Sequence, residues 1–129
     1  MILLDTHVLV WAVAEPKRLS RGAAAAIREA QQDGGLAISA ITLWELASLV
    51  ARGRIQAYGT IDASINLLIE GVVVRAITPV IASLAAQFPP QFSGDPADRI
   101  IGATARAEGL PLVTRDENIR MSPLLRTIW

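Results

Sequence analysis

Short apolar segments alternate with longer segments of helical periodicity along the chain. Residues 1–5 and 36–40 are almost wholly apolar, which is typical of strands buried on both faces of a sheet. Residues 72–77 and 112–114 are further strand candidates, and residues 126–129 predict a last strand. The pattern therefore predicts four or five short strands that are mostly buried.

Capping residues mark the helices between these strands. Ser20, Thr78 and Asp95 stand where an N-cap is expected, and the last two precede proline, which is favoured at the first helical position. Gly109 is placed to end the helix that Asp95 begins. We expect helices over residues 7–14, 20–32, 43–52, 60–70, 78–88, 95–108 and 116–121.

The alternation of strands and helices decides the expected fold class. It predicts a three-layer α/β/α sandwich with a mainly parallel sheet of four or five strands, in a single domain over residues 1–129. In such sheets, sites form at the edge where the carboxyl ends of the strands meet. Polar residues that follow the strands are therefore the first candidates for function.

Composition excludes several classes of protein. The chain of 129 residues is 52% hydrophobic and 19% charged, which is too apolar for a disordered segment. It contains no cysteine, so disulfides, thiolate zinc sites and a cysteine nucleophile are excluded. No apolar run approaches the ~20 residues of a membrane helix, and the N-terminal segment does not resemble a secretory signal. We expect a soluble cytoplasmic protein with no membrane association.

Charge gives less guidance about partners. Twelve basic and twelve acidic residues leave a formal net charge of zero, so bulk electrostatics does not indicate nucleic-acid binding. Lys17 is the only lysine among the basic residues. Codon usage explains this preference, but arginine also binds phosphates bidentately. Both explanations stay open at this stage.

Five acidic residues are predicted to lie at one edge of the sheet. Asp5 ends the first strand, Glu45 lies early in the helix after the second, and Asp116 follows the fourth. Asp95 and Asp98 begin the helix that leads into the fourth strand, and that helix runs antiparallel to the strand. Its first turn therefore lies at the carboxyl edge with the other acids.

Most of these acids also have a purely structural explanation. Thr42 and Glu45 have the spacing of a capping box, while Asp95 and Asp116 stand where N-caps are expected. Asp98 would favour the positive end of its helix dipole. Asp5 ends a buried strand and needs strong partners there. Crowded carboxylates repel one another unless a cation neutralises them, so the joint placement favours Mg²⁺ or Mn²⁺ over zinc.

Several neighbours of the acids are candidates for supporting roles. Thr6 and Thr114 each adjoin an acid at a strand end and can orient a carboxylate or hold a water molecule. Arg99 directly follows Asp98 and Arg115 directly precedes Asp116, and each either contacts a substrate phosphate or screens the carboxylates. His7 is expected to be satisfied by backbone groups, although contact with the site stays open. Both Trp11 and Trp44 are expected in the core.

The order of the motifs resembles a known family. The chain contains, in this order, the segments MILLDTHVLVW, SAITLWELA, GDPADRIIGATA and LVTRDENI. Together they resemble the PIN domain family, in particular the VapC-type ribonuclease toxins of type II toxin–antitoxin systems. The resemblance spans nearly the whole chain.

The resemblance implies both an activity and a set of site residues. It implies an endoribonuclease that hydrolyses RNA with one or two Mg²⁺ or Mn²⁺ ions. Asp5, Glu45 and Asp98 match the three acids that are nearly invariant in the family, and Asp116 matches the more variable fourth. Asp98 is preferred to Asp95 because of its distance from the following I-x-A-T-A segment. Asp5 and Asp98 are the expected direct ligands.

The resemblance also implies partners, and it leaves one alternative open. Thr6 and Thr114 match the family's hydroxyl positions. A small antitoxin is the implied protein partner, and a homodimer is the implied oligomer. The alternative is a catalytically silent PIN domain that recruits RNA or a protein. A phosphoacceptor receiver domain is disfavoured because it needs a lysine late in the chain, and the only lysine here is Lys17. A haloacid-dehalogenase phosphatase is disfavoured because it needs an acid two residues after the first-strand aspartate, where His7 stands.

Overall fold

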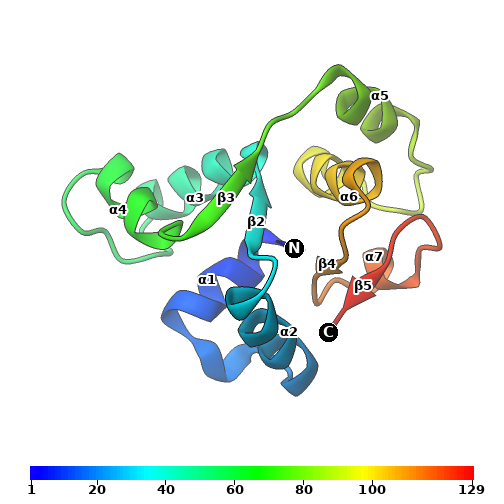
Figure 1. Ribbon diagram of the computed structural model, residues 1–129. Helices are drawn as coiled ribbons and strands as arrows, with labels where there is room; N and C mark the ends of the chain where they lie inside the picture. Colours follow the sequence, from blue (N-terminus) through cyan, green and yellow to red (C-terminus); the bar gives the residue numbers. More distant parts are fainter.

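Five parallel strands form one sheet in the order β3-β2-β1-β4-β5 (Figure 1). The computed structural model describes all 129 residues of the chain. The strands are β1 Ile2–Leu4, β2 Leu36–Ser39, β3 Val72–Arg75, β4 Leu112–Val113 and β5 Thr127–Ile128. All five strands were expected, and the sheet is wholly parallel. The predicted α/β fold is confirmed.

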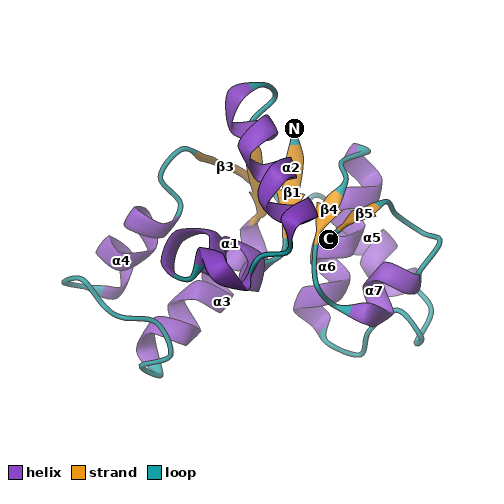
Figure 2. Ribbon diagram, turned by 90° about the horizontal axis from the view of Figure 1, so that it is seen from below, coloured by secondary structure: helices purple, strands orange, loops and turns teal.

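Helices cover both faces of this sheet. They are α1 Thr6–Ala14, α2 Arg21–Gln32, α3 Ala40–Ala51, α4 Ile61–Leu68, α5 Pro79–Gln87, α6 Pro96–Glu108 and α7 Glu117–Met121, with a 3-10 turn at Pro16–Arg18. Figure 2 shows α1 to α4 grouped apart from α5 to α7. No helix combines the length and the apolar character that crossing a membrane requires.

Alternation along the strands produces a core on each face. Ile2 and Leu4 pack in a cluster with α1, α2, α3 and α4, whereas Leu3 packs in a second cluster with α5, α6 and α7. Successive side chains of a strand point to opposite faces, so a short apolar strand contributes to both cores. The sheet is therefore buried on both faces, as the uninterrupted apolar runs predicted.

The helix after the second strand begins earlier than expected. It starts at Ala40, with Ser39 as its N-cap accepting a hydrogen bond of 3.3 Å from the Ile41 N–H. Thr42 therefore lies inside α3, fully buried, and the alternative explanation of Thr42 and Glu45 as a capping box does not hold. Ser39 and Thr42 are both good capping residues, and burial of Thr42 against α1 decides between them.

The prediction that Trp44 belongs to the core is also wrong. Its side chain is 64% exposed. Helix α3 buries Thr42, Leu46 and Val50, which are four residues apart and share one face. Trp44 lies two positions from Thr42 and from Leu46, about 200° around a helix with 3.6 residues per turn. It therefore points to the outside.

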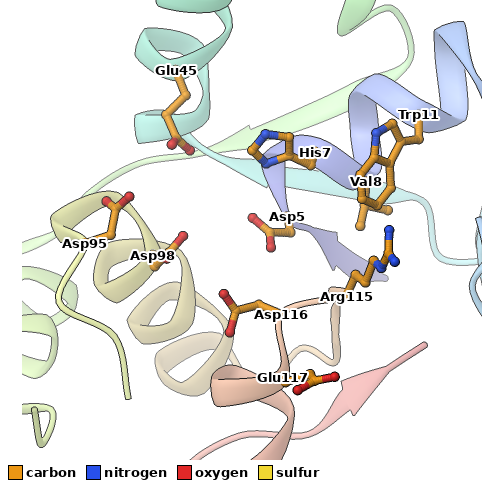
Figure 3. Close-up of a pocket in the computed structure, with 10 residues that line it drawn as sticks. All are labelled: Asp5, His7, Val8, Trp11, Glu45, Asp95, Asp98, Arg115, Asp116 and Glu117. Atoms are coloured by element: carbon orange, nitrogen blue, oxygen red, sulfur yellow. The ribbon is translucent and has the colours of Figure 1, made fainter. Parts of the chain in front are cut away.

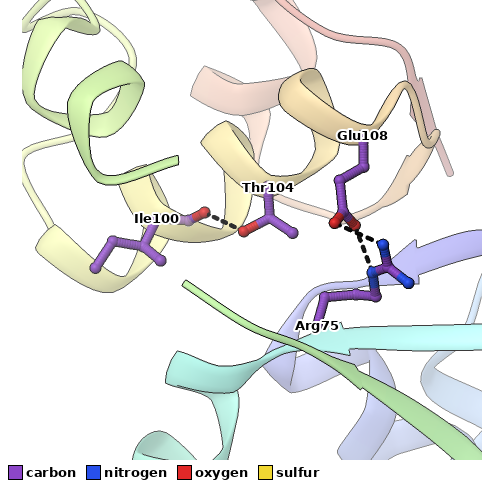
Figure 4. A network of polar contacts seen from close by, with 4 residues as sticks. All are labelled: Arg75, Ile100, Thr104 and Glu108. Carbon is purple, nitrogen blue, oxygen red and sulfur yellow. Dashed lines mark hydrogen bonds and ion pairs between the residues drawn. The ribbon is translucent and has the colours of Figure 1, made fainter. Parts of the chain in front are cut away.

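A bidentate ion pair fixes the edge strand β3 to α6. Arg75 donates from Nε and Nη2 to the two carboxylate oxygens of Glu108, both at 2.7 Å (Figure 4). The two residues are distant in sequence, and the fork geometry favours one relative placement of strand and helix. Within α6, the buried hydroxyl of Thr104 donates to the Ile100 carbonyl at 2.8 Å and so stays within its own helix (Figure 4).

Candidate functional site

An acidic pocket of about 400 Å³ opens at the carboxyl edge of the sheet (Figure 3). It is lined by Asp5, His7, Val8, Trp11, Glu45, Asp95, Asp98, Arg115, Asp116 and Glu117. All five acids that the sequence assigned to this edge are present. They come from the ends of β1 and β4 and from the helices α3, α6 and α7, as the parallel topology requires.

Asp5 lies at the junction between β1 and α1. Its Oδ1 accepts a hydrogen bond of 2.8 Å from the Thr6 N–H, which makes Asp5 the N-cap of α1. Its Oδ2 accepts a hydrogen bond of 2.7 Å from the hydroxyl of Thr114, at the end of the neighbouring strand. Each carboxylate oxygen has a further lone pair for another partner. The site therefore holds Asp5 in a fixed orientation with coordination capacity left.

A chain of threonine hydroxyls holds Glu45. The hydroxyl of Thr6 lies 2.5 Å from Glu45 Oε1, to which it donates, and 3.0 Å from the hydroxyl of Thr42. Thr6 has only one hydroxyl hydrogen, so Thr42 must be the donor in the second contact. The buried pair Thr6 and Thr42 therefore orients Glu45 from α1 and α3. Thr6 was predicted as a supporting residue, whereas Thr42 was assigned only to a capping box.

The first turn of α6 presents Asp95 and Asp98. Asp95 is the N-cap and accepts a hydrogen bond of 2.8 Å from the Ala97 N–H. Asp98 accepts a hydrogen bond of 3.0 Å from the hydroxyl of Ser93, and that hydroxyl accepts one of 3.1 Å from the Asp95 N–H. The capping role expected for Asp95 is confirmed. Sequence reasoning missed Ser93, which orients Asp98.

Asp116 is tied to Asp5 through a shared threonine. Asp116 caps α7 by accepting a hydrogen bond of 3.0 Å from the Ile119 N–H. The hydroxyl of Thr114 accepts one of 3.1 Å from the Asp116 N–H while it donates to Asp5. Thr114 is fully buried and couples two of the acids.

Comparison with known proteins shows the family to which the chain belongs. The family model described as the PIN domain matches residues 2–121. The chain belongs to the PIN domain family. The ribonuclease VapC22 of Mycobacterium tuberculosis (strain ATCC 25618 / H37Rv) is 43% identical over 130 residues, which cover 99% of this chain and 98% of that protein. The resemblance to VapC-type PIN domains is therefore confirmed.

Solved structures confirm the fold of this PIN domain. VapBC2 from Rickettsia felis, bound to a DNA fragment from their promoter, matches with a TM-score of 0.76 at 19% identity, covering 98% of this chain and 97% of that one. A toxin–antitoxin complex from Klebsiella pneumoniae matches with a TM-score of 0.68 at 22% identity, covering 97% and 95%. At these identities the likeness concerns the fold alone.

The acids of this PIN domain influence one another electrostatically. The pKa of Asp98 is raised to about 7, chiefly by burial, with the hydrogen bond from Ser93 opposing the rise and the charges of Asp5, Asp95 and Asp116 adding to it. Burial also raises the pKa of Glu45, with smaller contributions from Asp5 and Asp95. Arg115 is the only arginine among the residues that line the pocket, so the acids outnumber it, and a bound cation would relieve the repulsion between them.

Asp5 is subject to the same opposing effects. Burial raises its pKa, whereas its hydrogen bonds from Thr114 and Thr6 and the charge of His7 lower it, and Asp116 raises it again. The hydroxyl contacts favour the ionised carboxylate, which is the form that binds a metal ion. The threonines therefore keep Asp5 suited to act as a ligand despite its burial.

The donor set fits a hard divalent cation. It consists of carboxylate oxygens with free lone pairs around an open pocket, and the chain has no cysteine to favour a softer ion. The carboxylates surround the pocket rather than converge, since no three acidic or histidine side chains are close enough together to hold an ion as they stand. Ion binding therefore requires small side-chain movements.

Arg99 and Arg115, which each adjoin an acid in the sequence, have different environments. Arg115 lines the pocket, as expected of a substrate contact. Arg99 does not line it, because its guanidinium donates to the carbonyls of Ala85, Phe88, Pro89 and Ser93. The substrate role predicted for Arg99 does not agree with this geometry, since its donors are already used to hold the loop before α6.

His7 and Trp11 also lie at the pocket. The His7 side chain is exposed there, 6.0 Å from the Trp11 ring between centroids, and no hydrogen bond holds it to the backbone. The expectation of a backbone-satisfied histidine is therefore wrong. Trp11 is buried as predicted, with one edge on the pocket.

Proposed function

We propose that this PIN domain is a metal-dependent endoribonuclease that hydrolyses RNA phosphodiester bonds with Mg²⁺ or Mn²⁺. The observation that carries the proposal is the gathering of Asp5, Glu45, Asp98 and Asp116 around one pocket, oriented by buried hydroxyls. The printed name of the relative VapC22, which is 43% identical over nearly the whole chain, is that of a ribonuclease. The acids that match the family motif are the acids that line this pocket.

In this proposal each carboxylate has a distinct task. Asp5 and Asp98 are the direct ligands, because they face each other across the pocket from β1 and α6 (Figure 3). Glu45 and Asp116 act through water or position the attacking water molecule. When bound, a divalent ion lowers the pKa of water and stabilises charge on the phosphate oxygens.

The hydroxyl residues support these carboxylates. Thr114 and the Thr6 N–H each hold one oxygen of Asp5, while the Thr6 hydroxyl holds one oxygen of Glu45. Hydrogen bonds of this kind keep the carboxylates ionised and fix the direction of their free lone pairs. In this way the protein scaffold keeps the carboxylates of Asp5 and Glu45 in the same orientation throughout turnover.

The proposal includes a biological role as the toxin of a type II toxin–antitoxin pair that acts on RNA in the cytoplasm. The resemblance to VapC-type toxins supports it, and one solved structure with this fold is a toxin–antitoxin complex. Val13, Trp44, Tyr58 and Leu67 are more than half exposed, and three of them line a hollow beside α4. We propose that a small antitoxin covers this apolar surface.

A homodimer is a separate part of the proposal. The outer edge of β3 has no neighbouring strand, and Val73 and Val74 are exposed there. An apolar, unpaired edge favours association with another chain. Light scattering at micromolar concentration tests the homodimer directly. If the protein without antitoxin is monomeric, this part of the proposal is wrong.

Cleavage of a fluorescence-quenched single-stranded RNA tests the activity. Wild type is compared with Asp5→Asn and Asp98→Asn in Mg²⁺, in Mn²⁺ and with chelator. We expect metal-dependent cleavage that both substitutions reduce at least about a thousandfold, since the transition state loses several kcal/mol of electrostatic stabilisation. Asp33→Asn is the control, because Asp33 is exposed at the end of α2 and does not line the pocket.

Two results would contradict the proposal. Equal cleavage by the wild type and both asparagine variants would identify a contaminant or a misplaced site. If the wild type shows no Mn²⁺ binding by calorimetry and cleaves no RNA, the catalytically silent binding module is favoured instead. Circular dichroism of each variant confirms that the fold is retained.

A further inference from the structure

The pocket has two chemically different sides. Its acidic side carries the carboxylates described above, and its other side carries His7, Trp11 and Arg115 (Figure 3). The guanidinium of Arg115 lies 6.0 Å from the centre of the Trp11 ring, and that of Arg18 lies 4.6 Å from it. Cations beside an aromatic ring at such distances are held by the ring's quadrupole. This side therefore offers positive charge that is positioned by Trp11.

The cationic side continues into a second hollow of about 510 Å³. Glu117 lines both hollows, and the second is otherwise lined by Arg120, Met121, Thr127 and Trp129. The Trp129 ring lies 6.0 Å from the Trp11 ring between centroids, so the aromatic surface passes from one hollow to the next. We name Trp11, Arg115, Arg120 and Trp129 the arginine–tryptophan wall.

The arginines of this wall are available to a ligand. The ion pairs of the structure are Arg18 with Glu15 and Arg75 with Glu108. Arg115 and Arg120 are exposed and take part in neither an ion pair nor a side-chain hydrogen bond. Glu117 opposes them with one negative charge. Apart from the contact of Arg115 with the Trp11 ring, no interaction within the fold uses these two guanidinium groups.

Charge complementarity indicates what the wall binds. If a scissile phosphate lies among the carboxylates, the neighbouring phosphate needs a cation from the protein. The wall holds Arg115, which lines the acidic pocket, and Arg120, which lines the adjoining hollow. Arginine guanidinium groups bind phosphate oxygens bidentately, and aromatic rings bind unpaired bases by stacking. A base within a duplex cannot stack on a side chain in this way.

We infer that the arginine–tryptophan wall binds the unpaired nucleotide next to the scissile phosphate of a single-stranded RNA. Arg115 and Arg120 contact its phosphate, and Trp129 stacks on its base. Trp11 is a positioning residue that holds Arg115 at the pocket. This inference rests on the proposed ribonuclease function and names the residues that select single-stranded substrate.

Binding without turnover tests the inference. The probe is a fluorescein-labelled RNA dodecamer of mixed sequence, measured by anisotropy with chelator over a series of salt concentrations. We expect Arg115→Ala and Arg120→Ala each to raise the Kd about fivefold and to reduce the slope of log Kd against log salt by about 0.7, the value for one phosphate contact on a single strand. Trp129→Leu should raise the Kd about tenfold with an unchanged slope.

Matched variants distinguish binding from damage to the fold. Arg115→Lys keeps the charge and should keep the salt slope of wild type. Arg28→Ala should change nothing, because Arg28 is exposed on α2 and lines neither hollow. The same RNA annealed to its complement should bind more weakly and be insensitive to Trp129→Leu. In cleavage assays the arginine variants should raise KM and leave kcat within about threefold.

The inference and the proposed function fail in different ways. If wild type cleaves RNA while the arginine and tryptophan variants keep its KM and Kd, the ribonuclease stands and the wall has no role. If Arg28→Ala weakened binding as much as Arg115→Ala and Arg120→Ala do, the inference would also be overturned. The loss would then come from the lower overall positive charge and not from a specific site. If wild type neither binds nor cleaves RNA, the proposed function itself is wrong.

Discussion

The hydroxyl of Thr114 donates a hydrogen bond of 2.7 Å to Oδ2 of Asp5, although 109 residues separate them in the chain. The contact exists because β1 and β4 are parallel neighbours in the sheet and end at the same edge. The same hydroxyl accepts the Asp116 N–H, so one buried group positions two acids of the pocket. Several predictions about the site depend on such hydroxyl contacts.

Replacement of Thr114 by valine keeps the shape and removes both hydrogen bonds. We expect Mn²⁺ affinity and cleavage to fall about 10-fold to 100-fold, as for other residues that orient metal ligands. Because the hydrogen bond lowers the pKa of Asp5, that pKa should rise in the variant. The free energy of unfolding should fall by about 1–2 kcal/mol. Calorimetric titration with Mn²⁺ and chemical unfolding measure the two effects.

The control for this experiment is Thr104→Val. Thr104 is equally buried, but its hydroxyl contacts only a carbonyl of its own helix and does not line the pocket. It should leave Mn²⁺ affinity unchanged. Equal losses of affinity in both variants would assign the effect to general destabilisation instead of to the orientation of Asp5.

The metal-free protein should lose stability as pH rises. Burial raises the pKa of Asp98 to about 7 from an ordinary value of 3.8. Between these two values the folded state keeps a proton that the unfolded state releases, so the free energy of unfolding falls as pH increases from about 4 to about 7. Because Asp98 is partly exposed, screening limits the effect to about 1 kcal/mol.

Thermal unfolding with chelator at pH 5 and pH 8 measures this effect. Asp98→Asn should reduce the difference in Tm between the two pH values, because asparagine does not titrate. Excess Mg²⁺ should reverse the trend, since the ion binds the ionised carboxylates and stabilises the folded state more at higher pH. A pH dependence that is the same in Asp98→Asn would assign the effect to other groups.

Arg99 should be important for the loop before α6 despite its position outside the pocket. Its guanidinium donates to four backbone carbonyls, including that of Ser93, whose hydroxyl holds Asp98. Arg99→Met should lower the free energy of unfolding by about 2–3 kcal/mol, since four backbone carbonyls, most of them partly buried, lose a charged donor. Mn²⁺ affinity should fall as well, because the loop positions Ser93.

Lysine should not rescue Arg99, because one ammonium group cannot reproduce the planar fork. The Arg28→Lys variant is the control, as its side chain is exposed and away from this loop. Urea unfolding measures stability, and calorimetry measures Mn²⁺ affinity. Wild-type stability in Arg99→Lys would show that charge alone is sufficient there.

Gly102 should tolerate no larger side chain. A Cβ atom at this position would lie 2.3 Å from Cζ of Phe92 and 3.3 Å from Cε2 of Phe88. Gly102→Ala should therefore lower the free energy of unfolding by about 2–3 kcal/mol through overpacking, although alanine is the better helix former. Addition of Phe92→Leu should recover part of the loss in urea unfolding, and no recovery would contradict the steric explanation.

The fold class and the five acids at one edge of the sheet could be predicted from the amino-acid sequence. Uninterrupted apolar runs marked strands that are buried on both faces, and Ser20, Thr78 and Asp95 cap the helices that they were expected to begin. Local propensity and periodicity operate within one or two turns, so they can be recognised without tertiary information. The parallel order then brought Asp5, Glu45 and the acids of α6 and α7 to one edge, because every strand of such a sheet ends there.

The contacts that hold those acids in place could not be predicted from the sequence. Ser39 and Thr42 are equivalent capping candidates in sequence, and contact of Thr42 with Thr6 across two helices selected Ser39 as the cap. Arg99 and Arg115 each adjoin an acid in the sequence, yet packing against the loop before α6 used the donors of Arg99, while Arg115 lines the pocket without a hydrogen bond or ion pair. Such choices depend on contacts between distant segments, which periodicity along the chain does not contain.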